Sequence, residues 1–417
     1  MEGKKKLSFP LLLIILIVVI VGLVIFGVKT YYDNQIKNQP TSPNQFTLND
    51  VDYDKENFAF TFLQMENNKK NMVYSPLSIK YALNMLNEGA SGNTKLQIEN
   101  IIKDLELTNY KDIDKVLSLA NSVFIRNNFS NSVENNFINT LTEKYSAEVR
   151  YDSFENASSI NNWIENKTFG RIKNMISDEM VQDPLTVMVL VNALAIDMGW
   201  QHPFDNSDTY KDEFYLENGE KKLVETMHDN ITSSTASYYK DKNITALTMD
   251  LMKYQDTQME FMAIMPNENL YEYINNFSLI QLEDIISKLK PASYEKGGID
   301  VSIPKFSFEY DLSLKEDLKK LGIQDAFAEG VANFSNMAKE RLFVKEALHK
   351  ANIEFKENGI KAAAATALMM NMESMIIAPK EPLEVTIDKP FIFVIKDKNT
   401  SEIWFVGAMY EPVWEEE

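Results

Sequence analysis

Side chains that commonly carry catalysis or bind metals are scarce in this sequence. The chain has 417 residues and no cysteine, which excludes a cysteine nucleophile, a thiolate metal site and disulfides. The three histidines, His202, His228 and His349, stand far apart and lack the spacing of metal ligands. No G-x-S-x-G, H-E-x-x-H, G-x-x-x-x-G-K-[ST] or G-x-G-x-x-G motif occurs. The sequence therefore predicts a protein that is not an enzyme, with no cofactor and no metal.

One stretch has instead the composition of a strand that could be exposed or buried. Residues 358–379 read NGIKAAAATALMMNMESMIIAP. The even-numbered residues over 360–372 carry no charge, whereas the odd-numbered set holds Lys361, Asn371 and Glu373. Because side chains alternate between the two faces of a strand, this pattern indicates one buried and one exposed face. A short helix is the alternative, since alanine favours helices.

The small residues of this stretch suit a strand that enters between two existing strands. Residues 362–367, AAAATA, would enter at little steric cost, and Gly359 provides a hinge. Pro379 and Pro382 would stop a regular strand beyond them. Roughly fourteen residues of strand span about 45 Å. We therefore predict an exposed loop that can become a strand of a sheet.

The elements around this loop predict an α+β fold. Residues 77–86 and 160–175 have the apolar spacing of amphipathic helices. Strands are expected over residues 185–196, 259–266, 299–311, 391–395 and 402–410. The first, second and fourth of these are almost wholly apolar and predict strands buried on both faces. The third alternates in part, as a half-exposed strand does, and Gly407 breaks the last. Helices early and strands late, without regular alternation, favour α+β.

The N-terminal region predicts a membrane anchor. Residues 11–28 carry no charge and approach the roughly 20 apolar residues that cross a bilayer. The lysines in residues 1–10 place that tail in the cytoplasm and the rest outside the cell. Residues 29–46 form a polar spacer, and the domain follows over residues 47–417. The alternative is a cleaved signal peptide, which would give a secreted protein.

The charge of the chain argues against polyanionic partners. The net charge is -19, and no basic run occurs beyond the N-terminal tail. Proteins that bind nucleic acid usually carry a basic patch. We therefore expect no nucleic acid partner.

Six segments, in order along the chain, resemble the serpins, which are suicide inhibitors of proteases. The segments are SPLSIKYALNMLNEGASGNT (75–94), INNWIENKTFGRIKNMI (160–176), LVNALAIDMGWQHPF (190–204), VSIPKFSFEYDLSLKEDLKKLGI (301–323), EALHKANIEFKENGIKAAAATA (346–367) and DKPFIFVIKDKNTSEIWFVGAMYEP (388–412). The resemblance implies a monomer with helices packed around a large central mixed β-sheet and smaller sheets. It also implies an exposed reactive loop over about residues 357–380.

The resemblance also implies a mechanism. A serine protease attacks the reactive bond, Glu373–Ser374, and forms an acyl-enzyme. The freed loop then inserts into the central sheet and traps the protease before the ester is hydrolysed. The uncleaved fold is therefore metastable, and its stability is kinetic.

Family roles transfer to particular residues. The hinge of the loop is implied at Glu357, Gly359, Ile360, Ala362, Ala363, Ala364, Ala365 and Thr366. A polar cluster under the central sheet, called the shutter, is implied at Ser75, Ser78, Asn192 and His349. The point where insertion begins, called the breach, is implied at Trp200 and at an ion pair between Lys305 and Glu357.

The hinge departs from the family pattern at two positions. Ile360 and Lys361 stand where the family usually has Thr or Ser, then Glu. Neither should block insertion, but the bulk of Ile360 would slow it. A non-inhibitory serpin that acts as a binding or chaperone module is the alternative function, and the AAAATA run argues against it.

Glu373 before the reactive bond suggests a glutamyl endopeptidase as the target, since its pocket must hold a carboxylate. A shift of one residue would make Met372 the key residue. The target would then be elastase- or subtilisin-like.

Overall fold

The computed structural model describes residues 58–102, 107–108, 110–360 and 381–414. The predicted anchor, the spacer and the reactive bond lie outside these ranges, as do Ala362, Ala363, Ala364, Ala365 and Thr366. Within the described residues, no helix is both long and apolar enough to cross a membrane.

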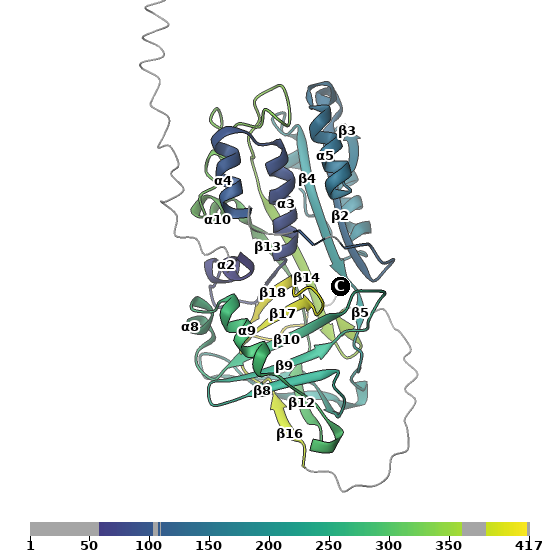
Figure 1. Cartoon of the computed structure of the whole chain (residues 1–417), viewed down its shortest axis with the longest axis vertical. Helices are drawn as coiled ribbons and strands as arrows, with labels where there is room; N and C mark the ends of the chain where they lie inside the picture. Colours follow the sequence, from purple (N-terminus) through teal and green to yellow (C-terminus); the bar gives the residue numbers. More distant parts are fainter. Residues whose placement is uncertain (1–57, 103–106, 109, 361–380, 415–417) are drawn as a thin grey trace, which may run out of the picture. The chain divides into compact units, whose positions relative to one another are not determined.

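Helices gather mainly in the first half of the described chain. They are α2 (Phe58–Met65), α3 (Pro76–Gly89), α4 (Gly92–Ile102), α5 (Asn135–Tyr145), α6 (Ser158–Lys167), α7 (Asp178–Gln182), α8 (Leu270–Asn275), α9 (Leu279–Lys288) and α10 (Leu314–Lys320). Helix α3 confirms the prediction over 77–86. Ser75 caps it by accepting from the Ser78 N–H at 3.1 Å, and Pro76 fills the first turn, where no N–H is needed. Figure 1 shows α3 beside α4 and next to the long strands.

The predicted helix over 160–175 is too long, because α6 ends at Lys167. Phe169 and Gly170, directly after the C-cap Thr168, have φ values of +55° and +81°, left-handed conformations that end the helix. The apolar residues beyond it, Ile172 and Ile176, still pack into the same cluster as Ile160 of α6. The segment after α6 therefore keeps the buried face of the pattern without the helix.

The seven-stranded sheet contains two of the predicted buried strands and the last predicted strand. Its order is β1 (Met72–Tyr74), β18 (Ile403–Met409), β17 (Phe391–Asp397), β10 (Met259–Pro266), β9 (Ile244–Asp250), β8 (Ala236–Lys240) and β11 (Lys290–Pro291). Strands β10 and β17 are buried throughout, as predicted. The predicted break at Gly407 is wrong, since β18 runs through it. A Cβ there would lie 2.1 Å from the Phe393 ring and 2.4 Å from the Met72 carbonyl oxygen, so glycine permits the close pairing.

A four-stranded sheet joins β16 (Leu383–Thr386), β12 (Ile299–Pro304), β7 (Lys221–Ile231) and β6 (Thr209–Tyr215) in that order. The single strand predicted over 299–311 is in fact two strands. Strand β12 belongs to this sheet, whereas β13 (Phe306–Ser313) pairs with β14 (Leu348–Lys356) elsewhere. Pro304 has no N–H to continue a ladder, and the chain changes sheets directly after it.

Two further sheets share one run of chain, and we call them together the central sheet and each of them a block. One block has the order β3 (Glu148–Asp152), β2 (Leu117–Arg126), β4 (Met188–Ile196), and the other β13, β14, β15 (Gly359–Ile360), β5 (Met198–Gly199). Strand β2 is parallel to β3 and antiparallel to β4, so the sheet is mixed. Only Asp197 separates β4 from β5, so one run of chain serves both blocks. Among the described strands, β4 is not paired with β14.

The strand predicted over 185–196 begins later, at Met188, and its first residues are only half-buried. We attribute this exposure to the edge of β4 that faces β14, where the described structure shows no ladder partner.

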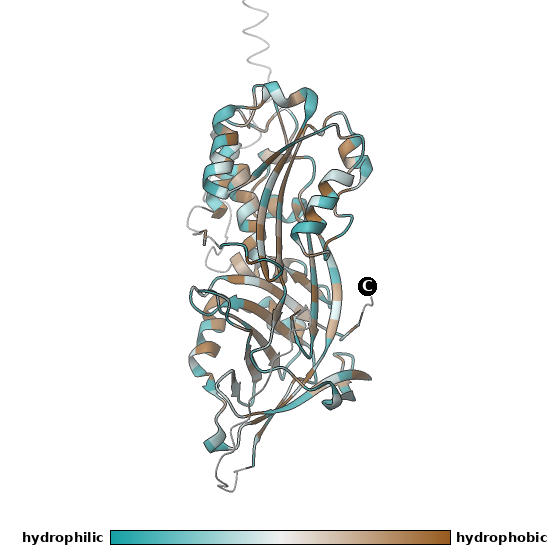
Figure 2. Ribbon diagram, turned by 90° about the vertical axis from the view of Figure 1, so that its right-hand side faces the viewer, coloured by the Kyte–Doolittle hydropathy of each residue, from teal (hydrophilic) through white to brown (hydrophobic). Residues whose placement is uncertain are grey.

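Aromatic rings join the central sheet to the seven-stranded sheet. Phe355 of β14 lies 4.8 Å from Phe306 of β13 and 4.4 Å from Phe261 of β10, measured between ring centroids. Such pairs add to the stabilisation that burial provides. Figure 2 shows hydrophobic residues concentrated on the strands, whereas the helices also carry hydrophilic residues.

Candidate functional site

The first residues of the predicted loop already form a strand inside the central sheet. Ile360 pairs with Phe355 of β14 on one side and with Met198 of β5 on the other. Ile360 is 2% exposed, as its even number predicts. Gly359 has a φ of +147°, and a Cβ there would lie 2.2 Å from the Met198 carbonyl oxygen. Only glycine fits this position, and the loop is therefore aligned with the two strands before it leaves them.

Trp200 holds the turn that leads into this short strand. Its indole N–H donates to the Lys356 carbonyl oxygen at 2.8 Å, and its backbone N–H donates to that of Asn358 at 3.0 Å. The backbone N–H of Phe204 donates to the Glu357 carbonyl oxygen, also at 3.0 Å. Trp200 is 1% exposed, so these bonds are shielded from water. The structure thus places the predicted breach tryptophan directly on the hinge.

The predicted ion pair lies beside this turn. Lys305 Nζ is 3.2 Å from Glu357 Oε1, and both side chains are mostly buried. Burial alone would raise the pKa of Glu357, but its backbone hydrogen bond and the charge of Lys305 hold that pKa below its usual value. The Trp414 ring lies 4.7 Å from the Lys305 ammonium. Sequence reasoning missed Trp414, because nothing near it in the chain indicates a hinge.

The structure brings three of the four predicted shutter residues together. The Ser75 N–H donates to His349 Nε2 at 3.0 Å, and Ser75 Oγ accepts from the Ser78 N–H. His349 is buried, and burial lowers its pKa to about 4. The ring is therefore neutral near pH 7, as an acceptor at Nε2 must be.

Asn192, the fourth shutter residue, lies on β4 and bonds elsewhere. Its amide donates to Asn121 Oδ1 at 2.8 Å, and the Asn121 amide donates to the Tyr145 carbonyl oxygen at 2.9 Å. The Oδ1 atom of Asn192 is buried without a hydrogen-bond partner among the residues that the structure describes. An unsatisfied buried acceptor is costly, and its presence here calls for an explanation. Sequence reasoning did not single out Asn121.

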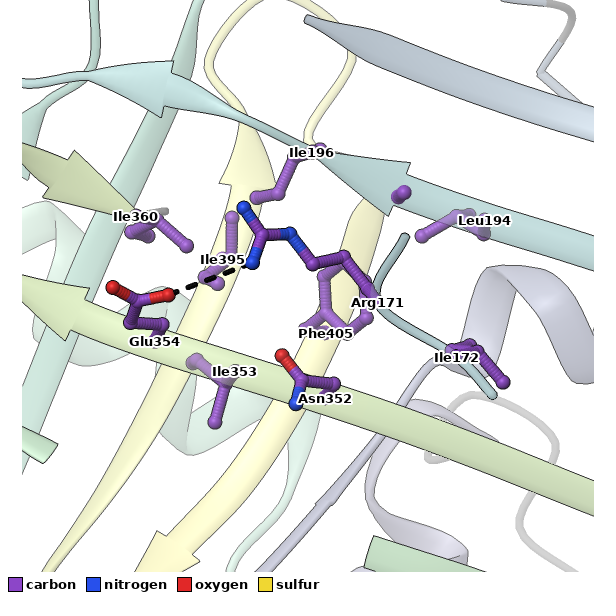
Figure 3. Close-up of a pocket in the computed structure, with 11 residues that line it drawn as sticks. Arg171, Ile172, Leu194, Ile196, Asn352, Ile353, Glu354, Ile360, Ile395 and Phe405 are labelled. Atoms are coloured by element: carbon purple, nitrogen blue, oxygen red, sulfur yellow. Dashed lines mark ion pairs between the residues drawn. The ribbon is translucent and has the colours of Figure 1, made fainter. Parts of the chain in front are cut away.

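A narrow cavity follows Ile360 between β4 and β14, and we call it the slot (Figure 3). Its lining residues are Arg171, Ile172, Leu194, Ala195, Ile196, Asn352, Ile353, Glu354, Ile360, Ile395 and Phe405. The volume is about 20 Å³, roughly the room that one water needs. A strand can therefore enter only if β4 and β14 move apart.

Arg171 bridges the mouth of the slot. Its guanidinium nitrogens lie 3.6 Å from Asp197 Oδ2 and 3.7 Å from Glu354 Oε2. Figure 3 shows the side chain reaching across the cavity toward Glu354. We call these three residues the Arg171 bridge. Sequence reasoning missed this bridge, because its three residues come from distant segments of the chain.

No metal site emerges from the part of the chain that the structure describes. No group of three or more His, Asp or Glu side chains there is arranged to hold a metal ion. His202 contacts Asp229 at 2.9 Å, and His228 stacks on Tyr210 with the ring centroids 3.9 Å apart. The main feature of the site is therefore the paired hinge, Gly359 and Ile360, which lies next to the narrow slot between β4 and β14.

Comparison with known proteins supports this interpretation. A family model described as serpin (serine protease inhibitor) matches residues 54–412. A serine protease inhibitor of Cyanea capillata is 31% identical over 373 residues, which cover 85% of this chain and 95% of the relative. The native-state structure of tengpin, a thermophilic serpin, aligns with a TM-score of 0.71 at 28% identity, covering 86% of this chain and 93% of that one. The latent-state structure of tengpin aligns with a TM-score of 0.66 at 26% identity, covering 85% and 95%. The described fold is thus more similar to the native state.

Proposed function

This chain belongs to the serpin family, and from that membership we propose that it inhibits serine proteases by trapping them as covalent acyl-enzymes. Membership supports protease inhibition in general. One observation carries the finer proposal: Gly359 and Ile360 are already paired between β14 and β5, at the mouth of the slot. The loop begins where an inserted strand would have to begin.

The register of this pairing can be continued along the slot. In an inserted strand that keeps this register, Ala362 would come between Ile196 and Ile353, where a methyl group would suit the space between two branched side chains. Every even-numbered residue of the loop then faces the core, as Ile360 does. The AAAATA run fits because each bulky substitution would have to push β4 and β14 further apart.

In an inserted strand of the same register, Thr366 would come opposite Asn192 and His349. The hydroxyl of Thr366 could then donate to the buried Asn192 Oδ1, which has no hydrogen-bond partner within the described ranges. Satisfying such a group contributes about 1 kcal/mol. Insertion would therefore complete the shutter.

The covalent step balances as ordinary acyl transfer. The protease serine oxygen attacks the Glu373 carbonyl carbon, the Glu373–Ser374 bond breaks, and the Ser374 amine leaves with the proton. The ester holds the protease on the loop. Insertion must be faster than hydrolysis of that ester, so the native fold is held by a barrier rather than by equilibrium stability.

We place the inhibitor on the outer side of a cell membrane, held by residues 11–28, because of the long uncharged run and the lysines before it. Its target there is a glutamyl endopeptidase if Glu373 precedes the reactive bond. An elastase- or subtilisin-like enzyme is the target if Met372 does.

The test mixes the full chain, in a mild detergent, with a glutamyl endopeptidase, an elastase and a subtilisin. Denaturing gels and intact mass should show a covalent complex and a released fragment that starts at Ser374. An Ala364→Glu variant, with a charge on the buried face, should be cleaved without forming the complex. Cleavage of the parent without any complex would overturn the proposal.

A further inference from the structure

We propose that Asn358 is a site of spontaneous deamidation, and that its conversion to isoaspartate disables the hinge. Asn358 and Glu357 are the two residues between β14 and β15, and they form the turn of the hinge. The modification needs only this chain and water. Its effect on protease trapping rests on the proposed function, whereas the modification itself does not.

The chemistry follows from an asparagine that precedes a glycine. The sequence has two such pairs, Asn358–Gly359 and Asn218–Gly219. The main-chain nitrogen of the glycine attacks the side-chain amide carbon of the asparagine, and no Cβ on the glycine shields that nitrogen. The nitrogen gives up its proton, ammonia leaves, and a succinimide ring closes. Water then opens the ring at one of its two carbonyl carbons, which gives aspartate or isoaspartate.

The two asparagine side chains are held differently. Asn218 Oδ1 accepts from the Glu220 N–H at 2.9 Å, and the Asn218 amide donates to Glu220 Oε2 at 2.9 Å. Among the residues that the structure describes, the Asn358 side chain has no hydrogen-bond partner. Asn358 is also only partly buried, so water can reach a ring formed there. The side chain of Asn358 can therefore turn toward the glycine nitrogen without breaking a bond.

The pairing of the hinge restrains the attacking nitrogen. Gly359 is buried and is paired with Lys356 on one side and with Gly199 on the other. Its main chain can turn toward the Asn358 amide only when the turn opens locally. Lys305 lies 3.2 Å from the carboxylate of Glu357 in the same turn and helps to hold the turn closed. The rate of deamidation at Asn358 should therefore report how often the hinge opens.

Isoaspartate does not fit the closed hinge. In isoaspartate the main chain runs through the side-chain carbons, which adds one carbon before Gly359. A Cβ on Gly359 would already lie 2.2 Å from the Met198 carbonyl oxygen and 2.7 Å from Gly199 Cα. These contacts are with main-chain atoms of β5, which cannot rotate away as a side chain can. The added carbon should therefore force Gly359 out of its pairing with β5.

The modification also changes an acceptor of the breach. The Asn358 carbonyl oxygen accepts from the Trp200 N–H at 3.0 Å. In isoaspartate this carbonyl becomes a free carboxylate beside the main chain. The new charge comes next to Glu357, whose own carboxylate is mostly buried, and like charges at close range repel. The longer main chain and the new charge both act against the paired hinge.

The first test follows the modification itself. The full chain, in a mild detergent, is kept warm at mildly alkaline pH, where the glycine nitrogen loses its proton more readily. Peptide mass spectrometry with fragmentation that separates isoaspartate from aspartate measures both Asn-Gly pairs. We expect isoaspartate at residue 358, formed about threefold faster in Lys305→Gln, whereas the rate at Asn218 should not change. Absence of isoaspartate at residue 358 overturns the site, and an unchanged rate in Lys305→Gln overturns its control by the hinge.

The second test measures what the modification does to the hinge. Asn218→Gln leaves Asn358–Gly359 as the one Asn-Gly pair, because glutamine would have to close a larger ring and does so much more slowly. Aged Asn218→Gln chains that carry isoaspartate are separated by their charge from unmodified ones. They should be cleaved in the hinge turn by a broad-specificity protease about fivefold faster. Asn358→Gln, compared with its own fresh sample, should show no such change on ageing.

The design distinguishes this inference from the proposed function. If the fresh parent traps no protease, the proposed function fails, and isoaspartate formation and hinge cleavage still decide the inference. If the parent traps a protease, the separated chains with isoaspartate at residue 358 should be cleaved by it without forming the covalent complex. Modified chains that resist hinge cleavage as unmodified chains do would overturn the proposal.

Discussion

The two ends of the slot are held in different ways. At the breach, β14 and β5 are tied through the paired residues Gly359 and Ile360 and through the bonds of Trp200 to the hinge turn. At the shutter, His349 bonds to the cap of α3, and Asn192 bonds to β2. Among the described residues, no hydrogen bond joins His349 to Asn192 across the slot. The difference teaches that the contacts that resist separation of the strands are concentrated at the breach, where insertion begins. At the shutter, the two sides of the slot are not bonded to each other through His349 and Asn192.

Loss of the breach tryptophan should have the largest effect on this contrast. Trp200→Ala removes a fully buried ring and its bond to the Lys356 carbonyl oxygen, at a cost of about 3–5 kcal/mol in the free energy of unfolding. Denaturant titration measures that cost. Trp404→Ala removes an equally buried ring from β18 and should cost a similar amount. Only Trp200→Ala should make the loop more sensitive to proteolysis; equal sensitivity in both variants would remove the special role of the breach.

The shutter histidine should make the free energy of unfolding depend on pH. Burial lowers the pKa of His349 to about 4, whereas the unfolded value is near 6.5. Between these values the unfolded chain binds an extra proton, so the free energy of unfolding falls by about 3 kcal/mol as pH drops from about 6.5 to 4. The contribution is complete above about 6.5.

Thermal unfolding across this pH range should show a smaller loss in His349→Gln than in the parent. His202→Gln, which changes a half-exposed histidine, should keep the full dependence. If His349→Gln follows the parent curve, the shutter histidine does not govern it.

Gly359 tests how closely the hinge is fitted to β5. Gly359→Ala forces a Cβ to within 2.2 Å of the Met198 carbonyl oxygen and should cost about 2–3 kcal/mol. Gly219 also has a positive φ, of +86°, but open space around it, so Gly219→Ala should cost only about 1 kcal/mol. Equal losses in denaturant titrations would mean that the hinge pairing adds nothing beyond backbone strain.

The breach ion pair should have the smallest effect. Glu357→Gln leaves Lys305 without its charged partner in a largely buried setting, and we expect a loss of about 1 kcal/mol. Glu213→Gln, at a pair with Lys221 on the surface, should leave the free energy of unfolding unchanged. A loss in Glu357→Gln no greater than in Glu213→Gln would show that the pair does not restrain the hinge.

Much of the fold could be predicted from local patterns. Uninterrupted apolar runs predicted β10 and β17, and apolar residues at helical spacing predicted α3. Errors arose where one residue acts through tertiary packing. Pro304 sends the chain into a second sheet, and Gly407 lets β18 pair without a break.

The residues of the candidate site also fall into those that could be predicted from the sequence and those that could not. Residues of the family pattern, such as Trp200 and the Lys305–Glu357 pair, could be named in advance, and the structure places them on the hinge. Asn121 and Arg171 could not, because their partners lie far away in sequence and only folding brings them together. The roles of the loop residues beyond Ile360 stay predictions.

The order of the seven-stranded sheet has a consequence for synthesis. Strands β17 and β18 lie between β1 and β10, although both are translated after them. A nascent chain therefore cannot pair β10 with β17 until β17 has left the ribosome, or β1 with β18 until β18 has left it. We expect the edges of β1 and β10 to stay unpaired until β18 and β17 are available. A chaperone should be most useful during that interval.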